Sequence, residues 1–481
     1  MKSVWVLLAC TLLFTPWGWS SGQDEIAITN VNVVDMRSGT VSHKLLVLVQ
    51  NGRIKSIAHV GLIGQSSHLR VINATGKYMI PGLWDMHVHS AFATAPAWTE
   101  QILMPLYLAN GITGIRDMGG DMTVLQQRKR RIDRGELAGP HMFIGGPFLD
   151  GSKNDAQTLA VDTPDKAHAA VDQVKQQGFD FVKILSRVPR DSYYAISTEA
   201  AKQGISFVGH VPDSVTAAEA SAAGQRSIEH LSGIIYACSS KADELRKQRD
   251  QARAKRDAAA YAAAAREAVE TCDPSKAHAL YSIFRTNKTW QAPTLVWTHA
   301  QAYLDAPGIA DDPRMKYVPL AVRPDWSTEK LLKNTTAQEM ADAKKEFSID
   351  QQLAGAMQKA GVMFLAGSDG PDPYVFPGFA LHDELQLLVK SGFTPLQALQ
   401  AATFNPALFL GKLDDYGLVE PGHVADLILL KENPLEDIRN TQKIDAVVAA
   451  GKYYSREDLD RMMKQAEEAA AKPADPSHAS H

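Results

Sequence analysis

The sequence contains the stretch Pro81-Gly82-Leu83-Trp84-Asp85-Met86-His87-Val88-His89, in which a mostly apolar run ends in two histidines. Side chains two positions apart on an extended strand point to the same side. The imidazoles of His87 and His89 would therefore face one point, which supplies half of a metal site. A pair of surface or packing histidines would explain the motif equally well, so the decision depends on the rest of the chain.

Eight short apolar segments alternate with helical patterns through the middle of the chain. This alternation predicts an α/β fold, specifically a TIM (β/α)8 barrel. The expected strands cover residues 79–83, 114–117, 142–145, 181–184, 206–209, 227–229, 293–296 and 363–366.

Four further side chains with ligand chemistry lie at or just beyond the ends of these expected strands. They are Lys183, His210, His230 and Asp369. Taken singly, Lys183 could be a buried lysine paired with an acid, and each histidine could be hydrogen-bonded in the core. In a TIM barrel, however, the carboxyl ends of the strands carry the chemistry, so the shared position favours one common site.

Short alternating strands stand at both ends of the barrel region. Residues 23–76 and 411–455 carry this pattern, and Asn51-Gly52 is a strong hairpin signal. We expect the two parts to assemble into one small β-sandwich domain beside a barrel of residues 77–410. Residues 456–481 should form a C-terminal helix and a flexible tail.

The N-terminus has the pattern of a targeting segment. Lys2 precedes an apolar core that is too short to span a bilayer, and small residues follow it near Ser20 and Gly22. Residues 1–22 are thus expected to be a cleaved signal peptide, with an uncleaved anchor as the alternative. The mature protein would be periplasmic or secreted, without a stable membrane span.

Two cysteines remain after removal of such a signal, Cys238 and Cys272, on either side of a charged, alanine-rich segment. An oxidising compartment allows them to pair at the base of a helical hairpin, although two free buried thiols fit almost as well. The segments 241–270 and 298–350 exceed a minimal barrel repeat. They could be solvated surface additions or the lid and walls of a substrate pocket.

The composition excludes several classes of partner. Hydrophobic residues make up 45% and charged residues 22% of the 481-residue chain, as in ordinary globular proteins, and the formal net charge is −4. This charge provides no basic surface for nucleic acid and no strong attraction to membranes. A small-molecule partner is expected, and self-association into a homo-oligomer is possible.

Taken together, the motifs resemble those of the metal-dependent amidohydrolase superfamily, in the imidazolonepropionase-related branch with Xaa-dipeptidases and ochratoxinases. The resemblance covers most of the chain outside the two insertions and the tail. It rests on the nonapeptide at residues 81–89 and on Phe181-Val182-Lys183-Ile184, Gly209-His210-Val211-Pro212, Ile228-Glu229-His230-Leu231-Ser232-Gly233, Ala366-Gly367-Ser368-Asp369, Gly422-His423-Val424-Ala425-Asp426-Leu427 and Asn433-Pro434-Leu435.

The resemblance implies a site for two divalent metal ions, for which zinc is the first choice. His87, His89 and Asp369 would hold the more buried ion, and His210 and His230 the more exposed one. Lys183 would bridge the two after reaction with carbon dioxide to form a carbamate, because a free ammonium group cannot ligate a cation.

The resemblance also implies hydrolysis of an amide bond by metal-activated water, with Asp369 as general base and then acid. Dipeptides, N-acyl amino acids and related amides such as ochratoxin are the expected substrates. Cyclic amides, lactones and organophosphate esters form the first alternative, and a non-catalytic metal-binding module is a second. Candidates for substrate contact are Arg187, Tyr193, Tyr194 and His382, the last of which could instead support the site.

Overall fold

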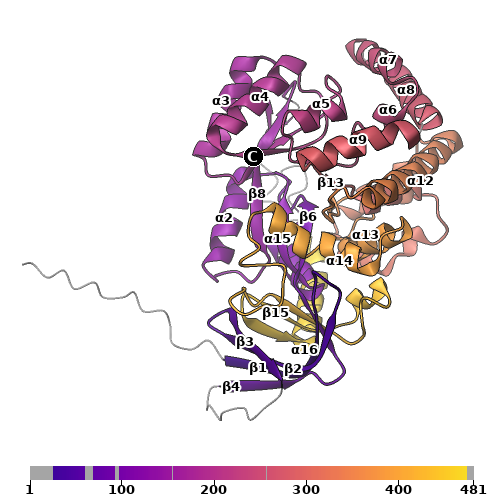
Figure 1. Ribbon diagram of the computed structural model, residues 1–481. Helices are drawn as coiled ribbons and strands as arrows, with labels where there is room; N and C mark the ends of the chain where they lie inside the picture. Colours follow the sequence, from indigo (N-terminus) through magenta and orange to yellow (C-terminus); the bar gives the residue numbers. More distant parts are fainter. Residues whose placement is uncertain are drawn as a thin grey trace, which may run out of the picture.

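The computed structural model describes residues 25–59, 69–92, 97–153, 155–255, 257–272 and 274–473. The expected signal peptide and the end of the expected tail lie outside these residues. One parallel sheet and one mixed sheet organise the fold (Figure 1).

The parallel sheet forms a barrel and confirms the expected α/β architecture. Its strands follow the chain order β6-β7-β8-β10-β11-β12-β13, and the short β9 (Thr158–Ala160) pairs with β8. Their bounds are Leu83–Val88, Ile112–Asp117, His141–Asp150, Phe181–Ile184, Ser206–Gly209, Ser227–Glu229 and Trp290–Ala292.

The segment that begins at Met363 closes the barrel between the first and last of these strands. The amide of Gln291 in β13 donates to the carbonyl of Met363 at 2.9 Å, and the amide of Met86 in β6 donates to the carbonyl of Ala366 at 2.9 Å. The segment thus takes the place of the expected eighth strand, and it delivers Asp369 to the end of the barrel.

Two expected strands were misplaced. Residues 79–83 do not form one strand, because the chain divides at Gly82 into β5 (Tyr78–Pro81), which joins the mixed sheet, and β6, which begins the barrel. A Cβ atom on Gly82 would lie 2.0 Å from Oγ1 of Thr113, so only glycine allows this close approach. At residues 293–296, the strand has already ended, and Thr294 adopts a left-handed φ of 48° before helix α10 (Leu295–Ala302).

Helices pack around the barrel through apolar faces. Helix α3, for example, begins where the Thr163 side chain accepts a hydrogen bond from the Lys166 amide, and it buries Ala170, Val171 and Val174. The helices of this layer, α3 included, are α1 (Glu100–Ala109), α2 (Met122–Asp133), α3 (Pro164–Gln176), α4 (Arg190–Gln203), α5 (Ala217–Ala222), α9 (Pro274–Asn287), α12 (Ala337–Lys359), α13 (Phe379–Lys390), α14 (Pro395–Ala401) and α15 (Phe404–Phe409).

The mixed sheet combines strands from both ends of the chain, as expected (Figure 1). Residues such as Ile28, Val47 and Leu427 form its buried cluster. His141 at the start of β8 reaches Asp426 at 3.2 Å and so ties this sheet to the barrel. The strands are β1 (Glu25–Val34), β2 (Val41–Gln50), β3 (Arg53–His59), β4 (Leu69–Asn73), β5, β14 (Leu427–Leu430), β15 (Ile444–Ala449) and β16 (Lys452–Ser455), and the expected C-terminal helix follows as α16 (Arg456–Ala470).

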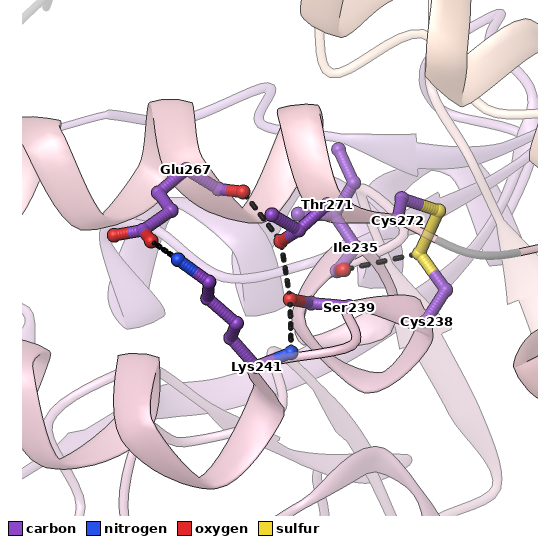
Figure 2. Close-up of a disulfide and its surroundings, with 7 residues drawn as sticks. All are labelled: Ile235, Cys238, Ser239, Lys241, Glu267, Thr271 and Cys272. Atoms are coloured by element: carbon purple, nitrogen blue, oxygen red, sulfur yellow. Dashed lines mark hydrogen bonds and ion pairs between the residues drawn. A yellow bond between two sulfur atoms is a disulfide. The ribbon is translucent and has the colours of Figure 1, made fainter.

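The first insertion is a helical hairpin that projects from the barrel (Figure 1). It consists of α7 (Ala242–Ala254) and α8 (Ala258–Thr271), preceded by the short α6 (Ile234–Cys238). A disulfide joins Cys238 to Cys272 at its base, and the hydroxyls of Ser239 and Thr271 share a hydrogen bond of 2.5 Å beside it (Figure 2). The stapled hairpin, rather than two free thiols, is therefore the arrangement found.

The second insertion is mostly short helical turns that lead into α12. They are η1 (Ile309–Asp311), η2 (Pro313–Tyr317), η3 (Arg323–Trp326) and α11 (Thr328–Leu332). Outside this insertion, one more short helical turn, η4 (Ile438–Gln442), precedes β15. Over the described ranges, we find no helix with the length and apolar character needed to cross a membrane.

Candidate metal centre and active site

His87 and His89 are oriented by hydrogen bonds through the same ring nitrogen. Nδ1 of His87 lies 2.8 Å from Oε2 of Glu229, and Nδ1 of His89 lies 2.8 Å from the carbonyl of Gly119. Because both partners are acceptors, each Nδ1 donates a proton to its partner and each Nε2 is the ring atom left to face a metal ion. The two Nε2 atoms point at Oδ1 of Asp369, at 3.2 and 3.4 Å.

These three side chains form a set of donors that fits a cation. Their ligand atoms lie within 4.8 Å of one another. Nε2 of His87 is buried and has no hydrogen-bond partner among the described residues. Burial alone would raise the pKa of Asp369, but the imidazoles of His87 and His230 hold that pKa well below its ordinary value, so the carboxylate is ionised. Two imidazoles and a carboxylate match the ligands that zinc prefers.

The loop that carries Asp369 is fixed by the end of β6. The amide of Asp369 donates to the carbonyl of His87 at 2.7 Å. Ser368 donates to the buried Asp85 through its hydroxyl at 2.6 Å and through its amide at 2.9 Å. Burial, partly offset by these bonds, raises the pKa of Asp85 to about 7. The end of β6 thus positions Asp369 as well as His87 and His89.

His210 and His230 follow β11 and β12 and face the same space. Nδ1 of His210 bonds to the Ser186 hydroxyl at 2.8 Å, and Nδ1 of His230 bonds to the Thr294 hydroxyl at 2.7 Å. The centres of the two rings are 5.1 Å apart. Burial lowers the pKa of both, to about 3 for His230, which keeps the rings neutral and able to ligate at pH 7.

Lys183, the last residue but one of β10, is almost completely buried, with 1% of its surface exposed. Its Nζ has no hydrogen-bond partner among the described residues, so it is not the lysine paired with an acid that was the alternative. Burial lowers its pKa to about 8, against the opposing charges of Glu229 and Asp369. A buried amine without a hydrogen-bond partner destabilises the fold. Its position therefore fits a lysine that is chemically modified and then binds metal ions.

A buried ion pair supports this centre from behind. Nη2 of Arg116 in β7 lies 3.0 and 2.9 Å from the two oxygens of Glu229, and Nη1 donates to the Ser227 hydroxyl at 3.0 Å. Burial would raise the pKa of Glu229, but Arg116 and His87 hold it far below its ordinary value. We did not single out Arg116 or Glu229 as site residues from the sequence. Glu229 directly precedes a ligand in its motif, and Arg116 is a charged residue in an apolar strand.

Most of these candidate ligands open into a cavity of about 300 Å³; the ones that line it are His89, His210, His230, Lys183 and Asp369. Its wall includes Trp297, whose ring centre is 5.6 Å from that of His230, and Asp372, which accepts a hydrogen bond from the Trp297 indole at 2.6 Å. The lining residues are His89, Phe92, Phe148, Lys183, Leu185, His210, His230, Trp297, Asp369, Pro371 and Asp372.

The sequence matches the model of the amidohydrolase family over residues 78–453, which is most of the chain. The chain belongs to this family. The match spans the barrel and strands β5, β14 and β15 of the mixed sheet, and it confirms the resemblance drawn from the motifs.

Similarity to individual members of the amidohydrolase family is partial in sequence and extensive in structure. An ochratoxinase of Aspergillus niger is 43% identical over 91 residues, which is 18% of either chain. A crystal structure of A. niger ochratoxinase has a TM-score of 0.64 at 17% identity, covering 90% of this chain and 96% of that one. A crystal structure of a Xaa-Pro dipeptidase with bound methionine has a TM-score of 0.65 at 19% identity, covering 90% of this chain and 100% of that one. The structure of bottromycin amidohydrolase has a TM-score of 0.70 at 21% identity, covering 93% of this chain and 90% of that one.

The structure does not place the four expected substrate-contact residues among the lining residues of the cavity. Arg187 forms an ion pair with Asp150 at 2.7 Å. Tyr193 is fully buried and donates to the Gln225 side chain at 3.0 Å. The Tyr194 ring lies beneath the Arg190 guanidinium, 5.2 Å away. His382 is buried between the Thr441 hydroxyl and the carbonyl of Asn110, each at 3.0 Å.

Proposed function

We propose that this amidohydrolase is an exported, binuclear zinc enzyme that cleaves the amide bond of a dipeptide, an N-acyl amino acid or a related amide such as ochratoxin. The observation that carries the proposal is the pair of buried nitrogens without partners among the described residues, Nε2 of His87 and Nζ of Lys183. His87 shares a set of metal-ligand atoms with Asp369, and Lys183 lines the same cavity as Asp369. Its family and the names of its relatives, an ochratoxinase and a Xaa-Pro dipeptidase, support amide hydrolysis.

His87, His89 and Asp369 would hold one ion, and His210 and His230 the other. When bound, two divalent ions would polarise the scissile carbonyl and lower the pKa of a water molecule that serves as nucleophile. Lys183 would connect the two sites as a carbamate. Its lowered pKa supports this, because only the neutral amine attacks carbon dioxide; the new N–C bond forms with loss of one proton and leaves an anionic carboxylate.

Asp369 moves the proton in the proposed reaction. Its carboxylate is ionised and is only partly buried, with 14% of its side chain exposed at the cavity. It can accept a proton from the attacking water and pass it to the leaving nitrogen, so that amine rather than amide anion departs. The Nε2 atoms of His87 and His89 face Oδ1 at 3.2 and 3.4 Å, where an ion shared by the three side chains would fix the carboxylate for this transfer.

One observation keeps the alternative reaction in view. No arginine stands among the described residues that line the cavity, so an obvious clamp for a substrate carboxylate is missing from that part of the wall. A cyclic amide, lactone or organophosphate ester needs no such clamp.

The test is hydrolysis of a panel of dipeptides and N-acyl amino acids by mature protein loaded with zinc in bicarbonate buffer. We expect release of free amino acid by the wild type and its loss in Asp369→Asn and Lys183→Ala. The exposed Lys175→Ala on α3 is the matched control and should retain activity. Two bound zinc ions per chain with no amide cleaved would refute the proposal and direct the search to lactones, cyclic amides and phosphoesters.

Export has its own test. Expression of the full chain in a Gram-negative host should give a periplasmic protein whose N-terminus begins near residue 20 or 22. A cytoplasmic product with an intact N-terminus would contradict export without affecting the proposed reaction.

A further inference from the structure

Asp372 is a carboxylate in the wall of the catalytic cavity, three residues beyond Asp369. The indole of Trp297 donates to its Oδ2 at 2.6 Å, and the Gln301 amide donates to the same oxygen at 3.2 Å. No described residue donates to Oδ1, and no described cation forms an ion pair with this side chain. Asp372 is therefore held by two neutral donors and has no cationic partner among the described residues. Burial and the neighbouring Asp369 raise the pKa of its carboxyl to about 7, so a cation placed beside Oδ1 would stabilise the ionised form.

The position of this carboxylate is fixed by one helix face. Trp297 and Gln301 are four residues apart on α10, and side chains with this spacing lie one above the other. The Trp297 ring also contacts His230, so the helix face that orients Asp372 borders the proposed metal site. The carboxyl group is thus held in a fixed position in the wall of the same cavity.

The rest of the described wall gives Asp372 no competing role. Its other charged groups, Lys183 and Asp369, belong to the proposed metal site, as do the histidines. The remaining members are the apolar or aromatic residues Phe92, Phe148, Leu185, Trp297 and Pro371. A ligand that fills this cavity would meet one ionisable side chain of the described wall that the proposed metal site does not use, the carboxyl group of Asp372.

We propose that Asp372 is a specificity-determining residue that binds the ammonium group of an aminoacyl substrate, such as the free N-terminus of a dipeptide. This inference rests on the proposed amide hydrolysis and narrows it. A carboxylate fixed by neutral donors in a half-buried wall binds an ammonium group through a charge-assisted hydrogen bond. The same carboxylate disfavours a substrate that places a second anion beside it, and it gains nothing from a neutral acyl chain.

A matched pair of substrates tests this directly. L-alanyl-L-phenylalanine and N-propionyl-L-phenylalanine differ only in an ammonium group replaced by hydrogen. We expect the zinc-loaded wild type to prefer the dipeptide by about 10- to 100-fold in kcat/KM, the range for a hydrogen bond to a charged group. Asp372→Asn should lower that ratio at least tenfold, mainly by raising KM for the dipeptide.

Asp305→Asn is the control, because Asp305 pairs with Lys344 and is not one of the cavity-lining residues. It removes the same charge and should leave the ratio unchanged. If Asp372→Asn does not fold, as judged by circular dichroism and zinc content, Asp372→Ser provides the second variant. A wild type without preference for the dipeptide, or a ratio that Asp372→Asn leaves unchanged, would overturn the inference.

Binding separates this inference from the proposed reaction. Calorimetry should show that 2-phenylethylamine binds the zinc-loaded wild type at least about tenfold more tightly than 2-phenylethanol does, and that Asp372→Asn removes the difference. If no amide is cleaved but this dependence holds, the reaction class fails and the ammonium site stands. If amides are cleaved but neither the binding nor the kcat/KM ratio depends on Asp372, the ammonium site fails alone.

Discussion

Replacement of Lys183 by methionine should make the metal-free protein more stable while it abolishes the proposed two-metal site. The Nζ atom is buried without a partner in the described structure, and its pKa is lowered from the ordinary 10.5 to about 8 by burial. Below pH 8 the Lys183 amine is protonated in both the folded and the unfolded chain, but the charged form is less stable in the folded chain. At about 1.4 kcal/mol per pH unit, this difference costs the folded state about 3 kcal/mol.

The sign of the pH dependence follows from the same shift. Because the pKa is lower in the folded state, the unfolded state binds more protons between pH 8 and 10.5, and stability rises with pH across this window. Methionine has a similar shape and no charge. The difference in unfolding free energy between Lys183→Met and wild type should therefore be about 3 kcal/mol at pH 7 and should shrink toward zero by pH 10.5.

Urea unfolding of the chelator-treated proteins at pH 7, 8, 9 and 10 measures this difference, provided that the slope with urea is the same for both. Lys175→Met on the exposed side of α3 is the control and should change stability by less than about 0.5 kcal/mol at every pH. If metal-free Lys183→Met is no more stable than the wild type at pH 7, the account of Lys183 as an unsatisfied buried amine is refuted.

Three further predictions follow from the packing around the site and the fold. Glu229→Gln should weaken zinc binding by about 10- to 100-fold in a chelator competition, because His87 loses the carboxylate that orients it; unchanged affinity would contradict this role. Replacing Cys238 and Cys272 together by serine should lower the unfolding free energy by about 3–4 kcal/mol, given the 34-residue separation, and an unchanged urea midpoint would show that the cross-link contributes nothing. Gly82→Ala should destabilise the protein by at least about 1–3 kcal/mol through its clash with β7, as measured by thermal unfolding, and a wild-type Tm would mean that the two strands separate at little cost.

Strands that are short, apolar and flanked by turn signals could be predicted from the sequence. The expected strands at 181–184, 206–209 and 227–229 coincide with β10, β11 and β12. The segment at 293–296 is equally apolar, but the left-handed conformation of Thr294 starts a helix there, and that conformation depends on tertiary structure. Local composition could not reveal it.

The candidate site shows the same division. The proposed ligands could be named because each lies in a motif at the end of a strand. The partnership of Arg116 with Glu229 could not, since it joins residues 113 positions apart in the chain. Nor could the sequence show that Tyr193 faces the core rather than the cavity, because either side of α4 is compatible with its position.

The segment that begins at Met363 closes the barrel against β6, and three proposed ligands lie on the two sides of this junction. His87 and His89 belong to the first strand, and Asp369 follows the last segment, joined to that strand by a few backbone hydrogen bonds. An ion bound by all three side chains would cross-link β6 to the closing segment. Hydrogen exchange in the metal-free protein should therefore be fastest, among the barrel amides, at the edges that this cross-link would otherwise hold together.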